Sequence, residues 1–442
     1  MRRALTAAIA SAALLGSTIA AAPASSASAN PVPDVQFGMH VPQIANGERP
    51  NANIGTIRLW DAGVAWGQVQ QKKNRFWWNG MDAAIASANA QNMSITYVLG
   101  STPKWAQKKK DRKKGRYPYN GTGAANPKAK DWKRWVRAVV QRYGNSIDAY
   151  QIWNEANLKD FYKGSPKQMA RLTRDAYRII KANDPTAKVV AASTTVRLTK
   201  RYKKFFPRYL RELRKMNWPV DAISVHTYPD GRGTPADRLR LVDRVNRDIN
   251  KARVPDRIEL WDTEVNYGIK GPGKIKGNSV EGPLAADWAA STFLDSILTG
   301  IDRTYWYYWY RPDGRLGVIL DNTPVGVTLG ALGYQTAYDW MVNSFYSCTR
   351  GGPGQPNVCQ LSDATDPEVV VWSNEGVGTY TVPAGATVQC NTLNQCSAIA
   401  PGTQLPIGGS PLWFGSQANY EQLLAQQQEN AAARAAVQAL PQ

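Results

Sequence analysis

Two glutamates in this 442-residue chain stand where an apolar, strand-like run gives way to a loop. Glu155 follows Trp153 and Asn154, and Glu264 follows Thr263. A carboxyl group flanked by Asn and Trp suits the end of a strand where a ligand binds better than it suits a core. Two such groups can hydrolyse a glycosidic bond, because one protonates the leaving oxygen while the other attacks the sugar. The alternative for either glutamate is a surface salt bridge.

Eight strand-like runs alternate with longer helical stretches between residues 35 and 342. The amphipathic stretches include Asp131–Tyr143, with apolar residues at i, i+3, i+4 and i+7, and Ser165–Ala182, which opens on a Ser-Pro N-terminus. This alternation predicts an α/β fold, a (β/α)8 TIM barrel. A doubly wound sheet is the alternative, but no glycine-rich phosphate turn follows an early strand. The predicted strands are Val35–His40, Thr56–Trp60, Ser94–Leu99, Ile147–Trp153, Lys188–Ser193, Ala222–His226, Arg257–Thr263 and Thr304–Tyr308.

The barrel hypothesis also predicts where the two glutamates lie. Catalytic residues of such barrels sit at the carboxyl ends of the strands. Glu155 would follow the fourth strand and Glu264 the seventh. Both carboxyl groups would then face the same opening and could act on one bond.

Beyond Val342 the sequence changes to short strand-like runs separated by Gly, Pro, Asn and Asp turns. This spacing predicts a small C-terminal antiparallel β domain of sandwich-like type over residues 343–415. Residues 416–442 form an Ala- and Gln-rich tail, for which a frayed helix or disorder is expected. The catalytic barrel is expected over residues 30–342.

The first 29 residues have the features of a signal peptide. Arg2 and Arg3 precede the apolar run Ala4–Ala22, and Ala27-Ser28-Ala29 matches a cleavage site. No later stretch is long and apolar enough to predict a membrane span. We therefore expect a secreted protein, either free in the medium or associated with a cell wall.

The four cysteines, Cys348, Cys359, Cys390 and Cys396, all lie in the last quarter of the chain. In a secreted protein an even number of cysteines indicates disulfides, and four allow three connectivities. Proximity in the sequence favours Cys348–Cys359 and Cys390–Cys396. A zinc site is the alternative, but the spacing fits no common metal pattern and both histidines are distant.

The net charge of +20 is concentrated in two stretches. Lys104–Arg116 contains eight Lys or Arg residues, and Arg197–Lys215 is similarly basic. A solvated surface would account for this charge. The alternative is a polyanionic partner, such as an acidic polysaccharide, a wall polymer or nucleic acid. Export disfavours nucleic acid.

Several short motifs resemble those of the clan A glycoside hydrolases, the retaining (β/α)8 enzymes, and among them family 39 looks nearest. Asn154-Glu155 resembles the acid/base signature after strand four, and Thr263-Glu264 the nucleophile motif after strand seven. The other motifs that carry the resemblance are Arg58 after strand two, Ser224–Pro229 after strand six and the aromatic run Tyr305–Trp309 in strand eight.

The resemblance implies a role for each matched residue. Glu155 would be the acid/base and Glu264 the nucleophile, which Arg58 and Tyr228 would keep ionised. Asn154 would donate to the sugar 2-hydroxyl. The remaining matched residues are His226, which would contact the substrate or orient Glu264, and Trp306, which would stack on a sugar. A turn asparagine, a structural ion pair and a core histidine are the alternatives for Asn154, Arg58 and His226.

We therefore predict a secreted retaining glycoside hydrolase that acts on a polysaccharide, with an anionic polymer suggested by the charge. The alternative is a non-catalytic wall- or polysaccharide-binding protein on a glycosidase scaffold. No cofactor, metal ion or nucleic-acid partner is expected, and the protein is expected to be a monomer. A serine hydrolase lacks support because no G-x-S-x-G motif is present.

Overall fold

The computed structural model describes residues 31–108, 123–270, 277–310, 315–321, 326–361 and 366–440. The predicted signal peptide lies outside these ranges. So does the basic segment beyond Lys108. No helix of the described ranges has the length and apolar character that a membrane span requires.

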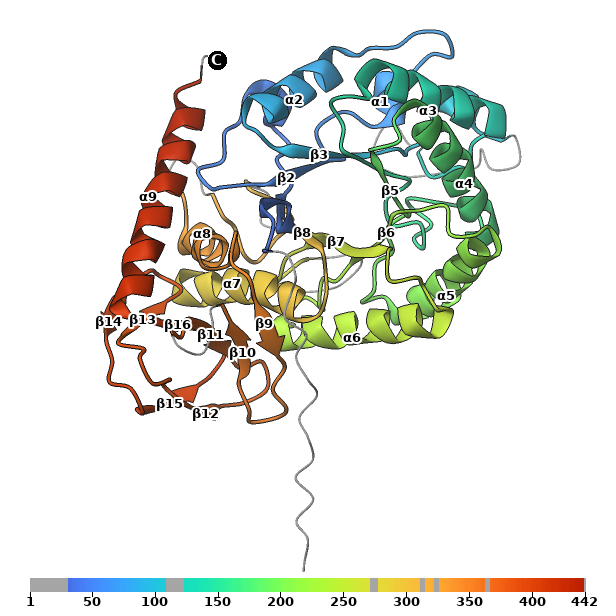
Figure 1. Cartoon of the computed structure of the whole chain (residues 1–442). Helices are drawn as coiled ribbons and strands as arrows, with labels where there is room; N and C mark the ends of the chain where they lie inside the picture. The colour runs from blue at the N-terminus through green and yellow to red at the C-terminus, as the bar shows by residue number, and fades with distance from the viewer. Residues whose placement is uncertain are drawn as a thin grey trace, which may run out of the picture.

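The barrel prediction is confirmed: eight parallel strands close into a ring in sequence order. Figure 1 shows helices surrounding this ring. Each predicted strand overlaps an observed one, although most observed strands are shorter. The strands are β1 Phe37–Met39, β2 Thr56–Leu59, β3 Ser94–Val98, β4 Ala149–Gln151, β5 Lys188–Val190, β6 Ala222–His226, β7 Glu259–Val265 and β8 Arg303–Trp306.

The helices of the barrel pack their apolar faces on the strands. In α3 the predicted stripe is buried, with Trp132 and Trp135 fully enclosed. Helix α4 begins after Ser165, whose hydroxyl accepts from the backbone N–H of Gln168 while the Gln168 side chain accepts from the Ser165 N–H. The helices are α1 Trp66–Val69, α2 Asn79–Ala90, α3 Ala129–Tyr143, α4 Pro166–Asn183, α5 Thr199–Lys215, α6 Pro235–Ala252, α7 Gly282–Leu298 and α8 Leu329–Met341.

The side chains inside the barrel change character along the strands. Near the amino ends an apolar layer forms from Ala149, Val190, Ala222, Trp261 and Tyr305. Two residues further along β4, β6 and β7 the inward positions are polar, because side chains alternate in a strand. These polar residues are Gln151, Ser224 and Thr263, and hydrogen bonds join them. The barrel interior is therefore apolar near the amino ends of the strands and polar below the carboxyl-terminal mouth.

The C-terminal region forms antiparallel sheets, as predicted. A six-stranded sheet has the order β14-β13-β16-β11-β10-β9, and β12 pairs with β15. The strands are β9 Ser347–Thr349, β10 Asn357–Gln360, β11 Val369–Trp372, β12 Gly378–Thr381, β13 Val388–Asn391, β14 Cys396–Ala398, β15 Gln404–Ile407 and β16 Leu412–Gly415.

Both disulfides favoured by proximity are confirmed. Cys348–Cys359 joins β9 to β10, and Cys390–Cys396 joins β13 to β14. Each pair faces directly across its two strands. The disulfides therefore fix short strands at the two edges of the six-stranded sheet.

The sheet is held to the barrel through buried acids on α7. Asp295 accepts hydrogen bonds from Trp372 Nε1 (2.8 Å) and Asn374 Nδ2 (3.1 Å). Asp287 accepts from the hydroxyls of Thr392 and Ser410. Burial raises the pKa of Asp295 to about 7. These contacts make α7 the common support of both parts.

The Ala- and Gln-rich tail is one continuous helix, α9 Gln417–Gln438. Ser416 begins it with a capping box to Asn419. Figure 1 shows α9 running from the C-terminal sheets past α8 toward the barrel rim. Polar contacts hold it along its length, because few of its residues are apolar enough to bury.

Candidate active site

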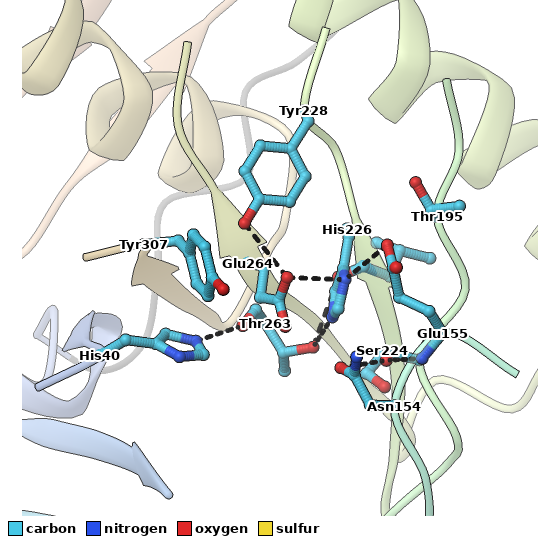
Figure 2. Close-up of polar contacts among 12 residues, drawn as sticks. His40, Asn154, Glu155, Thr195, Ser224, His226, Tyr228, Thr263, Glu264 and Tyr307 are labelled. Carbon is cyan, nitrogen blue, oxygen red and sulfur yellow. Dashed lines mark hydrogen bonds and ion pairs between the residues drawn. The ribbon is translucent and has the colours of Figure 1, made fainter. Parts of the chain in front are cut away.

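Glu155 and Glu264 meet at the carboxyl-terminal mouth of the barrel, where β4 and β7 end. Figure 2 shows their side chains converging with His226 between them. One ligand atom from each of these three residues lies within 4.8 Å of the other two. The structure therefore brings both predicted carboxyl groups to one point.

Glu264 is held by a cation and a phenol. Arg58 NH1 donates to Glu264 Oε1 (2.7 Å), and Tyr228 Oη donates to Oε2 (3.1 Å). The Arg58 side chain is fully buried. Burial raises the pKa of the Glu264 carboxyl, and the Arg58 guanidinium opposes that rise. The charged donor favours the ionised form of Glu264.

Arg58 also fixes the neighbouring side chains. Its NH2 donates to Asn154 Oδ1 (2.7 Å) and its Nε to Gln151 Oε1 (2.7 Å). Because the Asn154 oxygen is occupied, the Asn154 Nδ2 group is the part of the amide left to donate to a ligand. One guanidinium from β2 thus orients two side chains at the end of β4 and one in β7.

Glu155 has a different environment. Its backbone adopts a left-handed conformation (φ 39°), which is uncommon for a residue other than glycine. The Glu155 N–H donates to Ser193 Oγ (2.9 Å), and this bond helps hold the turn. Burial raises the pKa of Glu155 to about 7, against the lowering effects of Arg197 and the Thr195 hydroxyl. Glu155 is therefore largely protonated below pH 7.

His226 lies between the two carboxyl groups and is neutral. Its Nδ1 is 3.2 Å from Glu155 Oε1 and 3.3 Å from Glu264 Oε2, and its Nε2 is 3.1 Å from Thr263 Oγ1. Burial lowers the pKa of His226 to about 3. Two carboxyl groups face Nδ1, which assigns the proton to Nδ1 and leaves Nε2 to accept from Thr263.

His40 and Tyr307 form the opposite wall of the site (Figure 2). His40 Nε2 donates to the backbone carbonyl of Thr263 (3.0 Å). The ring of Tyr307 packs edge-on against His40 (4.9 Å between centroids) and against Tyr228 (5.9 Å). An aromatic side chain from the end of β8 therefore does reach the site.

That aromatic residue is not Trp306, so the prediction for Trp306 is wrong. Trp306 is fully buried and packs against Tyr267, outside the barrel. The reason is strand alternation: Tyr305 points into the barrel floor and hydrogen-bonds to Thr56 and Thr96, so Trp306 must point outward. Tyr307 then takes the inward position.

Six predicted residues come together at the mouth: Glu155, Glu264, Asn154, Arg58, His226 and Tyr228. Sequence reasoning missed Gln151, Thr263, His40 and Tyr307. A signal for the first two was present, since a polar residue stands at the inward position of β4 and β7, two residues after an apolar one. His40 and Tyr307 gave no such signal.

Glu155, His226 and Glu264 could each offer one ligand atom to a metal ion. Two observations disfavour such a site. Arg58 already holds Glu264 at 2.7 Å and would repel a cation. The proton on His226 Nδ1 occupies the atom that faces the carboxyl groups.

Comparison with known proteins finds similarity to glycoside hydrolases. Residues 60–240 match the model of glycosyl hydrolase family 10. A beta-xylosidase of Caldicellulosiruptor saccharolyticus is 27% identical over 121 residues, which are 26% of this chain and 24% of that protein. The chain thus matches about a quarter of the length of this curated relative.

Solved structures share the fold over most of their length. The GH39 enzyme from Xanthomonas axonopodis pv. citri gives a TM-score of 0.62 at 17% identity, covering 88% of this chain and 95% of that chain. A monomeric beta-xylosidase from Caulobacter crescentus CB15 gives 0.60 at 16% identity, covering 88% and 97%. A GH30 endoxylanase from Clostridium papyrosolvens C71 gives 0.55 at 14% identity, covering 88% and 98%.

The closed barrel and the match over residues 60–240 make this chain similar to the (β/α)8 glycoside hydrolases of clan A. Its fold lies near that of family 39. The resemblance drawn from the sequence motifs is confirmed at this level.

Proposed function

We propose that the protein is a secreted retaining glycoside hydrolase that cleaves a polysaccharide through a covalent glycosyl intermediate on Glu264. The observation that carries this proposal is the approach of the two carboxyl groups within 4.8 Å at one mouth. Retaining glycosidases hold these groups about 5–5.5 Å apart, whereas inverting enzymes need about 6.5–9.5 Å to admit a water molecule.

In the first step Glu264 attacks the anomeric carbon while Glu155 gives its proton to the leaving oxygen. The bond from the anomeric carbon to the leaving oxygen breaks, and a bond to a Glu264 oxygen forms. The pKa of about 7 for Glu155 keeps it protonated for this role. In the second step Glu155, now ionised, takes a proton from water, which attacks the anomeric carbon and releases Glu264.

The surrounding residues support both steps. Arg58 and Tyr228 hold the attacking carboxylate. Asn154 Nδ2 donates to the sugar 2-hydroxyl, a contact that strengthens as positive charge develops on the ring. Neutral His226 donates from Nδ1 to whichever carboxyl group is ionised. Tyr307 offers a ring face or edge to the bound sugar.

The names of related proteins give the first substrates to test. Beta-xylosidases and an endoxylanase are among them. We propose a β-linked glycan of the xylan type or a related polymer as the substrate class. The Caulobacter crescentus protein is described as monomeric, and we propose the same state here. The two disulfides support an extracellular location.

The outer wall of the barrel supports an anionic polymer. The neighbouring helices α3, α4 and α5 carry 18 Lys or Arg residues and three Asp or Glu residues. Helices α7 and α8 carry no Lys or Arg and three Asp. One side of the molecule therefore has a strong positive potential, which would concentrate an anionic chain near the mouth.

The reaction is tested by the release of reducing ends from neutral and acidic polysaccharides by the mature protein. Glu264→Gln is measured alongside. Turnover that the variant loses, with retained anomeric configuration in the first product, supports the proposal. Polysaccharide binding by both proteins without turnover in either would instead support the non-catalytic scaffold, which the intact carboxyl pair disfavours.

The anionic preference is tested separately. Lys200→Gln, Lys203→Gln and Lys204→Gln on α5 are combined. The control combines Lys251→Gln, Arg253→Gln and Arg257→Gln, three exposed positions at the end of α6 and in the loop before β7. We expect the α5 variant to weaken binding of acidic polymers and to reduce its salt dependence. Equal affinity for acidic polymers in the two triple variants would exclude a role for the α5 lysines in binding them.

A further inference from the structure

An open groove on the outer wall of the barrel combines an aromatic ring with positive charge. It lies between the segment that precedes α2 and the helix α3, and its volume is about 480 Å³. Figure 1 shows α3 outside the ring of strands, so the groove is separate from the barrel interior that holds the two glutamates. The residues that line it include Lys73, Asn74, Phe76, Arg134, Arg137 and Gln141.

Helix α3 forms one side of the groove with its outer face. Its apolar face is buried, and Trp132 and Trp135 are fully enclosed there. Arg134, Arg137 and Gln141 are exposed and lie three and four positions apart, so they are neighbours on one face of the helix. The groove therefore has two adjacent guanidinium groups and an amide along this side.

Phe76 supplies the apolar part of the groove, and its ring is held by other aromatic residues. It stacks on Trp78 with 4.8 Å between ring centroids and lies nearly parallel to Trp135 at 6.4 Å. Trp135 stacks in turn on Trp66 at 5.7 Å. Phe76 is only half-buried. Because the ring is already fixed, a ligand that packs on its exposed part costs little conformational freedom.

The three cations that line the groove have no acidic partner among the described residues. No ion pair there involves Lys73, Arg134 or Arg137. The acids of the adjoining helices, Asp82 on α2 and Asp131 on α3, each pair with a cation that does not line the groove. The groove thus presents a positive charge that the protein does not neutralise.

Two amide groups complete the groove. Arg134 NH1 donates to Asn74 Oδ1 (3.3 Å), and this bond joins α3 to the segment before α2. The Asn74 Nδ2 group is left to donate to a ligand. Gln141 adds a second amide on the side of α3.

We propose that this groove binds a segment of an acidic polysaccharide at a place separate from the catalytic mouth. One repeating unit of such a chain offers an apolar C–H face, hydroxyl groups and a carboxylate or sulfate. These groups match the ring of Phe76, the two amides and the guanidinium groups of Arg134 and Arg137. The proposal rests on the proposed function for its class of ligand, because a second site would keep the polymer at the enzyme while bonds are cut at the mouth.

The first test measures the affinity of the mature protein for a short oligogalacturonate by calorimetric titration. Glu264→Gln is present in every variant, so that the ligand stays intact. Arg134→Gln and Arg137→Gln are combined. The matched control combines Arg208→Gln and Arg211→Gln, two exposed arginines with the same spacing on α5. The titrations use about 0.3 M salt, which screens charges that do not contact the ligand.

We expect the α3 double variant to bind about 10-fold more weakly and the α5 double variant less than about 3-fold more weakly. Equal losses in the two variants would overturn the proposal, because they would show that only the overall charge of this side matters. Both α3 positions are exposed, so without Glu264→Gln the α3 double variant should keep the wild-type Tm and the wild-type kinetics on an aryl glycoside.

The second test concerns the ring and the kind of polymer. Phe76→Leu keeps an apolar side chain but removes the ring, and it should weaken oligogalacturonate binding about 5-fold at every salt concentration. Unchanged affinity in Phe76→Leu would overturn the match to a sugar face. Xylohexaose, which carries no charge, should bind no more weakly to the α3 double variant. Binding of a single-stranded oligothymidylate as tight as that of oligogalacturonate would overturn the assignment to a polysaccharide.

The groove and the hydrolase mechanism fail in different ways. Turnover by the wild type together with undiminished binding in the α3 double variant would leave the mechanism standing and refute the groove. Loss of binding in the α3 double variant, without turnover of any polymer by the wild type, would keep the groove and refute the hydrolase.

Discussion

β4 and β7 each end in a glutamate at the mouth of the barrel, but the two carboxyl groups have different surroundings. At β7, Glu264 accepts from a buried guanidinium at 2.7 Å and from a tyrosine hydroxyl. At β4, burial dominates: it raises the pKa of Glu155 against the opposing effects of the Arg197 charge and the Thr195 hydroxyl, and neutral His226 lies beside the carboxyl group. The backbone also differs, since Glu155 alone of the two has a left-handed conformation.

The contrast shows how one residue type takes two roles. A charged donor in contact favours the ionised form and suits an attacking group. Burial without such a donor favours the protonated form and suits an acid. The division of labour thus depends on where Arg58 is placed, and four substitutions and one pH profile test it.

The largest effect is expected from Glu264→Gln. Without the attacking carboxylate the covalent intermediate cannot form, so kcat should fall by about 10⁴-fold or more on every glycoside. Initial rates on polymer and on aryl glycosides measure this. Residual activity above about one hundredth of wild type would assign the attack to another group.

Glu155→Gln should depend on the leaving group. Loss of the proton donor should lower kcat by about 10²–10⁴-fold on a polysaccharide. A 4-nitrophenyl glycoside needs little protonation, so its bond cleavage should be affected much less. Equal losses on both substrates would contradict the assignment of Glu155 as the acid.

Arg58→Lys keeps a positive charge but removes the planar set of donors. We expect kcat/KM to fall by about 100-fold because Glu264, Asn154 and Gln151 lose their common anchor. The pKa of Glu264 should rise, so the acidic limb of the pH profile should move to higher pH. A Tm measurement separates this effect from partial unfolding, which would lower activity without moving the limb.

The pH profile of the wild type should have a basic limb near pH 7, where Glu155 loses its proton. The pH dependence of the free energy of unfolding is also set in part by the Glu155 carboxyl group. Its folded pKa is raised above the unfolded value of 4.5, so the free energy of unfolding should fall as pH rises between about 4.5 and 7. Glu155→Gln should therefore raise Tm more at pH 8 than at pH 4. An equal change of Tm at both pH values would contradict a raised pKa for Glu155.

The smallest effect is expected from Thr195→Val. The Thr195 hydroxyl lowers the pKa of Glu155, so its removal should move the basic limb upward by less than one pH unit. Rates at pH 6 should change only a few-fold. A downward shift of the limb would mean that the hydroxyl does not favour the ionised acid.

The sequence was sufficient for the parts of the site that depend on local patterns. The barrel followed from eight apolar runs, and Asn154-Glu155 and Thr263-Glu264 carry their context in adjacent residues. Residues 305–309 are all aromatic, so alternation alone could not say which of them face inward. His40 directly follows β1, and its place in the site depends on its hydrogen bond to the carbonyl of Thr263, which is distant in the sequence.

The tail illustrates the same limit. Its composition gave no apolar stripe, yet α9 is ordered because its partners are backbone carbonyls and side chains elsewhere in the chain. Gln438 donates to the Arg49 carbonyl, Arg434 to Asn53 Oδ1 and Asn430 to Asp339 Oδ1. Such partners cannot be read from the composition of the helix itself.

These contacts of α9 have a consequence for how the molecule unfolds. The helix begins beside the C-terminal sheet, where Asn419 bonds to Asp366, and it ends on the loop before β2. The last turn of α9 therefore packs against residues that precede most of the barrel in the sequence. Loss of the sheet would free the helix, and loss of the helix would expose the barrel rim. The barrel and the C-terminal sheet should accordingly unfold together, in one calorimetric transition, although each has its own set of strands.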